Sequence, residues 1–183
     1  MKTAACILCM LLFVPGTSYA LEPKITDLLV TNTPGSVLVY FRVINCFTKD
    51  MEEAVFAGIP VTFTYTAELY QERSYWTDRM VTYHEIRHTI KYDNVKRLFF
   101  VSFSEEGKNT EQFTEFSKAK AAMTDVNGAA VAQVNDLQKG KKYYLRAKAE
   151  LDMIQLPLHL EYVFFFVSLW DFETAWARQD FVF

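Results

Sequence analysis

The sequence predicts a mainly β protein, an antiparallel sandwich of the immunoglobulin or fibronectin type with two short helices. Runs rich in β-branched and aromatic residues follow one another, with turn residues between them. Strands and helices do not alternate in the way that is typical of a parallel sheet. Leu137, Gly140 and Tyr143 have the spacing of a tyrosine corner, in which the hydroxyl bonds back to the upstream backbone.

Most of the chain is predicted to form strands. The predicted strands cover residues 24–30, 36–44, 59–70, 80–90, 95–104 and 141–151, with one or two more in the aromatic C-terminal segment. The run 59–70 shows the clearest pattern, because Val61, Phe63 and Tyr65 alternate with threonines. Such alternation is typical of a strand that buries one of its faces.

The first helix is predicted within residues 48–60. Thr48 can cap its N-terminus, and the acidic residues that follow suit the positive end of the helix dipole. Met51 and Val55 lie one turn apart on the same face. Gly58 fits the left-handed position that ends a helix.

The second helix is predicted within residues 109–123. Asn109 and Gln112 resemble a capping box at its start. An apolar stripe follows, made of Phe113, Phe116, Ala119 and Met123. We expect this stripe to pack over the open face of the sheet, the alternative being a face that docks a partner.

Residues 1–20 have the pattern of a cleaved secretory signal peptide. Lys2 precedes an apolar run, and Ser18-Tyr19-Ala20 forms a small-x-small cleavage site. We therefore expect residues 21–183 to form a single domain in the periplasm or outside the cell. No later apolar stretch has the length of a transmembrane helix. Peripheral contact with a membrane is an alternative that the sequence allows.

Charge and cysteine content narrow the possible functions. The formal net charge is −3, and becomes −4 without Lys2, while the basic residues are scattered. This pattern argues against a nucleic-acid-binding protein, because binding to the phosphate backbone requires clustered lysine and arginine. Cys46 is the one cysteine left after cleavage, so an internal disulfide is excluded, and we expect this thiol to be buried.

His84, Glu85 and His88 match the H-E-x-x-H signature of zinc proteases. We interpret the match as a coincidence within a strand, because the run 80–90 is rich in β-branched and aromatic residues. On a strand the two histidines share a face but stand about 13 Å apart, too far for one zinc ion. We expect that face to be partly exposed. A third ligand is missing at short spacing, and only distant glutamates would remain: Glu105, Glu111 and Glu115.

The C-terminal segment is unusually aromatic. Trp170, Phe172 and Trp176 are candidates for a binding surface that contacts lipid or another protein. The alternative, which we prefer, is a closing strand whose aromatic side chains are buried.

Several of these runs together resemble the bacterial domain-of-unknown-function family 4390. The resemblance rests on "AGIPVTF", on "IKYDNVKRLFFV" and above all on "LQKGKKYYLRAKAELDMIQLPLHL". It extends over most of the chain after the signal peptide. It implies an exported, β-rich domain, and it implies no activity, catalytic residues or cofactor.

From the sequence we expect a non-enzymatic accessory or sensory module that uses no cofactor and binds another protein of the cell envelope. An alternative is a carrier or sensor of an apolar ligand, with Phe99 and Phe100 among the residues that line its pocket. A zinc hydrolase built on the H-E-x-x-H motif is the remote alternative.

Overall fold

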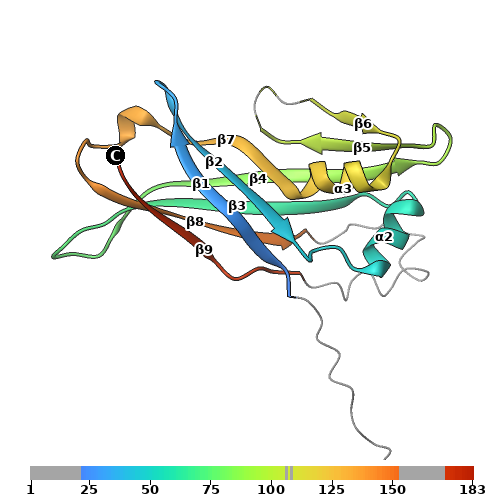
Figure 1. Cartoon of the computed structure of the whole chain (residues 1–183), viewed down its shortest axis with the longest axis horizontal. Coiled ribbons are helices and arrows are strands. Elements are labelled where there is room, and N and C mark those ends of the chain that lie inside the picture. Colours follow the sequence, from blue (N-terminus) through green and yellow to red (C-terminus); the bar gives the residue numbers. More distant parts are fainter. Residues whose placement is uncertain (1–21, 106, 108, 153–171) are drawn as a thin grey trace, which may run out of the picture.

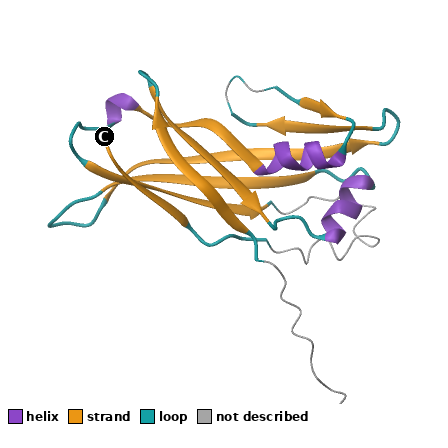
Figure 2. Cartoon of the chain, viewed as in Figure 1, coloured by secondary structure: helices purple, strands orange, loops and turns teal. Residues whose placement is uncertain are grey.

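The computed structural model describes residues 22–105, 107, 109–152 and 172–183. Their strands form two antiparallel sheets that curve into a half-barrel (Figures 1 and 2). The smaller sheet has the order β1-β2-β7, and the larger has the order β6-β5-β4-β3-β8-β9. The fold is therefore mainly β and antiparallel, as predicted, although this strand order does not show an immunoglobulin-like topology.

The strands are β1 (Lys24–Asn32), β2 (Ser36–Ile44), β3 (Val61–Gln71), β4 (Arg79–Asp93), β5 (Leu98–Phe103), β6 (Glu111–Phe113), β7 (Asp125–Gln133), β8 (Lys142–Leu151) and β9 (Ala177–Val182). The helices are α2 (Lys49–Phe56) and α3 (Phe116–Thr124), with a 3-10 turn at Val134–Asp136. All six strands predicted by range are present, with ends shifted by a few residues. β9 confirms a further strand in the aromatic C-terminal segment.

One core joins the two sheets. The alternation predicted for β3 is confirmed for the inner face, where Val61, Phe63 and Tyr65 are wholly buried, but Thr64 and Thr66 on the other face are buried as well. The two helices contribute Met51 and Met123 to the same core. α3 lies against β4 and β5 and buries Ala119 and Met123 there as expected, whereas Phe113 of the predicted stripe lies on β6.

The first predicted helix is confirmed as α2. The Thr48 hydroxyl accepts a hydrogen bond from the backbone N–H of Met51 at 3.2 Å. Met51 and Val55 are buried, and Gly58 follows the helix with φ of 84°. Beyond the helix, a Cβ at Gly58 would lie 3.2 Å from the Asn94 side chain, so glycine suits both the backbone conformation and the space.

The start of the second predicted helix was wrong. Residues Glu111–Phe113 form β6, and α3 begins only at Phe116, with Glu115 at the N-cap position. The predicted capping box of Asn109 and Gln112 therefore does not exist. Pairing of β6 with β5 provides backbone hydrogen bonds that a local helix pattern cannot anticipate.

The tyrosine corner is confirmed. The backbone N–H of Gln138 donates a hydrogen bond to the Tyr143 hydroxyl at 2.8 Å. Gly140 between them has φ of 73°, the left-handed region that favours glycine. This contact fixes the loop between β7 and β8, and the same loop forms one wall of the groove described below.

Candidate interaction surface

The H-E-x-x-H motif lies in the middle of β4, a strand of fifteen residues. The register pairs His84 with Ala67 and His88 with Phe63, so the two histidines point to the same face of the sheet. The predicted strand is confirmed. The expected partial exposure was wrong for His88, whose side chain is 0% exposed because α3 and β5 cover this part of β4.

Both ring nitrogens of His88 have partners inside the protein. Nδ1 lies 3.0 Å from the carbonyl oxygen of Met123, and Nε2 lies 3.1 Å from Oε1 of Glu105. A carbonyl only accepts hydrogen bonds, so Nδ1 must carry a proton. The Nε2 contact then requires one further proton, held either by the imidazole or by the carboxyl group of Glu105. The Tyr65 hydroxyl donates to the same Met123 carbonyl at 2.5 Å.

Glu85 points to the opposite face of β4, where it has other partners. Its carboxylate accepts hydrogen bonds from the Tyr83 hydroxyl at 2.6 Å and from Arg87 at 3.1 Å. In a strand, neighbouring residues alternate between faces, so Glu85 is turned away from both histidines. Within the described ranges, no group of three or more His, Cys, Asp or Glu side chains could hold a metal ion. Of the three distant glutamates, Glu105 alone is brought against His88.

Cys46 is buried, as expected. Burial raises the pKa of its thiol to about 12 from an ordinary value of 9.0. A thiol that stays protonated at neutral pH is a poor nucleophile and a poor metal ligand.

Phe99 and Phe100, proposed to line an apolar pocket, lie on opposite faces of β5. Phe99 is buried against the rings of Phe56, Tyr92 and Phe116. Phe100 lies beneath the ammonium group of Lys96, 5.5 Å from the ring centre. The two side chains therefore cannot line the same cavity.

The aromatic candidates of the C-terminal segment divide into two kinds. Phe172 is buried, with its ring 5.1 Å from that of Phe63, which agrees with the interpretation that aromatic side chains here close the core. Trp176 is 41% exposed and contributes to a surface. Trp170 lies outside the described residues.

Trp176 belongs to a row of cationic and aromatic side chains on the outer face of β3, β8 and β9. We call this the aromatic–arginine row, and its members are Tyr70, Tyr144, Arg146, Trp176 and Arg178. The rings of Tyr70 and Tyr144 stack at 5.1 Å, with 9° between their planes. The Arg178 guanidinium lies 3.7 Å from the centre of the Tyr144 ring. The Arg146 guanidinium lies 4.4 Å from the centre of the Trp176 ring and 5.1 Å from that of Tyr70.

Carboxylates hold this row in place. Arg146 donates to Glu68 at 2.5 Å, and this hydrogen bond is the main cause of the raised pKa of Arg146. Arg178 bonds to Asp180 and to Glu72, and its pKa is raised mainly by Asp180. Contacts within the chain therefore hold the side chains of the row in place.

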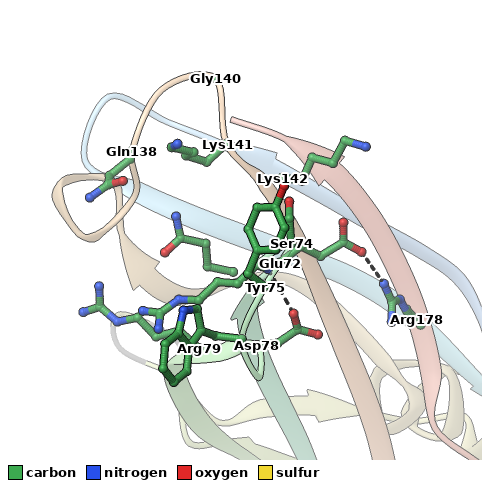
Figure 3. A pocket seen from close by; sticks show the side chains of 13 residues that line it. Glu72, Ser74, Tyr75, Asp78, Arg79, Gln138, Gly140, Lys141, Lys142 and Arg178 are labelled. Atoms are coloured by element: carbon green, nitrogen blue, oxygen red, sulfur yellow. Dashed lines mark hydrogen bonds and ion pairs between the residues drawn. The ribbon is translucent and has the colours of Figure 1, made fainter.

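An open groove of about 760 Å³ lies at one end of the sheets, between the β3–β4 hairpin and the loop before β8 (Figure 3). We call it the basic groove. It is lined by Gln71, Glu72, Arg73, Ser74, Tyr75, Trp76, Asp78, Arg79, Gln138, Gly140, Lys141, Lys142 and Arg178. Arg178 and Glu72 join it to the aromatic–arginine row.

The basic groove was not predicted from the sequence. Residues 74–79 lie between the predicted strands 59–70 and 80–90 and were assigned no role, although Tyr75 and Trp76 are consecutive large aromatic residues there. That pair was the available signal, because a solvated turn does not need two such side chains. Lys141 and Lys142 of the opposite wall belong to the longest basic cluster of the chain, which we interpreted as a solvated turn, and their distance in sequence gave no sign that they lie beside this pair.

These features define a mainly β, two-sheet half-barrel with an aromatic and charged outer surface. The chain belongs to the family described as the domain of unknown function DUF4390, whose model matches residues 20–180. This confirms the resemblance found in the sequence. The searches among curated proteins and among solved structures found no match. None of the helices in the described ranges has the length and apolar character needed to cross a membrane.

Proposed function

We propose that the protein is an exported, non-enzymatic accessory module of the cell envelope that binds another protein through the aromatic–arginine row. The N-terminal signal pattern supports a location in the periplasm or outside the cell. The tyrosine corner supports a relation to immunoglobulin-like sandwich domains, which often serve as binding modules.

The observation that carries this proposal is the preordered packing of Arg146 between Tyr70 and Trp176. Tryptophan, tyrosine and arginine are the residue types that contribute most of the binding energy at protein interfaces. Side chains already held by stacking and by ion pairs lose little conformational entropy when a partner binds. The row offers such side chains on one continuous sheet face.

Site-specific photo-crosslinking in the native cell envelope tests this proposal. A photoreactive phenylalanine analogue replaces Trp176, and in a control chain it replaces Leu29, an exposed apolar residue on β1 of the smaller sheet. We expect a discrete protein adduct from position 176 and none from position 29. The adduct should weaken when Arg146→Lys is added, because lysine keeps the charge but loses the planar stacking. Equal adducts from both positions, or none from position 176, would contradict the proposal.

A further inference from the structure

The β3–β4 hairpin projects beyond the sheets at the end that carries the basic groove (Figure 1). Its tip holds Tyr75 and Trp76, which are 94% and 81% exposed. Within the described part of the chain, neither ring stacks on another aromatic ring or lies against a cation. Two consecutive large side chains are thus left in solvent at the most prominent point of this end.

The groove beside these rings is positively charged. Its lining contains five cationic side chains and two carboxylates, a formal net charge of +3, whereas the whole chain carries −3. Both carboxylates already have partners. Asp78 accepts hydrogen bonds from the Arg73 backbone N–H and from the Tyr144 hydroxyl, each at 3.1 Å. Glu72 accepts one from Arg178 at 2.9 Å.

The remaining four cations are free to meet an external anion. Among the described residues, no side-chain hydrogen bond or ion pair engages them: Arg73, Arg79, Lys141 and Lys142. Figure 3 shows Lys141, at the end of the loop before β8, and Lys142, the first residue of β8, opposite the hairpin that carries Tyr75 and Arg79. The cations therefore come from both walls and flank the exposed aromatic tip.

We infer that this end of the molecule docks on an anionic lipid surface, with Tyr75 and Trp76 entering the headgroup region and the four cations contacting lipid phosphates. Tyrosine and tryptophan are the residues enriched at membrane–water interfaces. Clustered lysine and arginine are attracted to anionic leaflets. An acidic protein segment would use the same charges, but a protein site buries its aromatic anchors in a pocket, whereas these rings stand at a protruding tip.

Vesicle co-sedimentation provides the test. The protein is expressed from the full-length sequence, and its N-terminus is checked by mass spectrometry. It is mixed with phosphatidylcholine vesicles that either contain about 30% phosphatidylglycerol or lack it. We expect binding to the anionic vesicles only, and weaker binding when salt is raised from about 0.05 to about 0.5 M, because salt screens surface charges.

Two pairs of variants assign the binding to this end. Lys141→Gln with Lys142→Gln should lower the affinity about thirty-fold, since each cation near an anionic surface contributes about a factor of five. Its control is Lys49→Gln with Lys118→Gln, which makes the same charge change on two exposed helix residues and should have little effect. Tyr75→Ser with Trp76→Ser should lower the affinity about tenfold or more. Its control is Val95→Ser, at a 93% exposed apolar residue beyond the opposite end of β4.

The other outcomes overturn the inference. Equal binding to neutral vesicles would assign the interaction to apolar contact elsewhere in the chain. If the control variants lose as much vesicle affinity as the variants at the hairpin end, the binding does not depend on the hairpin end. If the protein binds neither vesicle type while a photo-crosslinker at position 75 forms an adduct with another protein, this end is a protein-binding site instead. None of these results bears on crosslinking from Trp176, so the two proposals fail separately.

Discussion

The imidazole of His88 and the carboxylate of Glu105 lie 3.1 Å apart inside the protein, although one belongs to β4 and the other follows β5. The side chain of His88 is 0% exposed and that of Glu105 is 6% exposed. A buried polar pair of this kind costs free energy when one partner is removed, because the other loses its hydrogen bond without regaining water. Burial in the core and two hydrogen-bond partners within the chain therefore account for this histidine.

His88→Ala is expected to lower the free energy of unfolding by about 3–5 kcal/mol, because it opens a cavity and removes a hydrogen-bond partner from Glu105. Urea denaturation followed by circular dichroism measures the change. His84→Ala is the matched control on the same strand and should change the value by less than about 1 kcal/mol. His88→Gln, which keeps part of the hydrogen bonding, should fall between the two. Equal effects at both positions would contradict the importance of the buried pair.

The purified protein is expected to contain no stoichiometric zinc. His84 and His88 are four residues apart on a strand, which separates them by about 13 Å, and Glu85 faces the other way. Inductively coupled plasma mass spectrometry after dialysis measures the metal content. One zinc per chain that disappears in His84→Ala would overturn this assignment.

Cys46 should not react with Ellman's reagent at pH 8 until the protein is unfolded, because burial raises the pKa of its thiol to about 12. The folded state favours the neutral thiol. This contribution to stability is full below pH 9.0, the ordinary thiol pKa, and is lost as pH rises from there toward 12. Cys46→Ala should show less of this alkaline loss in urea denaturation. Rapid labelling of the native protein would show that the thiol is accessible.

Tyr143→Phe should lower the free energy of unfolding by about 1–3 kcal/mol, because it removes the acceptor of a partly buried hydrogen bond from the backbone N–H of Gln138. Thermal and urea denaturation measure the effect. Tyr83→Phe is the matched control, since the Tyr83 hydroxyl bonds to Glu85 at an exposed position. The control should change stability by less than about 0.5 kcal/mol. If the two variants lose the same stability, the tyrosine corner is not a stabilising contact.

Much of the local structure could be predicted because it is set by neighbouring residues. The alternation of β3, the Thr48 cap and the turn at Gly140 each depend on a few adjacent side chains and on backbone preferences. β7 was missed for the opposite reason. Its sequence "DVNGAAVAQ" has little β propensity, and pairing with β2 forms the strand. At Gly128 φ is 73° and a Cβ would lie 3.3 Å from the Tyr40 hydroxyl, so the backbone conformation and a neighbour on β2 both favour glycine.

By itself the sequence determined the antiparallel β class, the strand character of the H-E-x-x-H segment and the family of the chain. Only the tertiary structure decided which distant residues meet. Glu105 reaches His88, Arg146 lies between Tyr70 and Trp176, and Lys141 faces the β3–β4 hairpin. The physical reason is that strand propensity and turns act locally. Sheet order and register instead depend on how the whole chain buries its apolar faces, and they bring together side chains whose spacing in the sequence carries no signal.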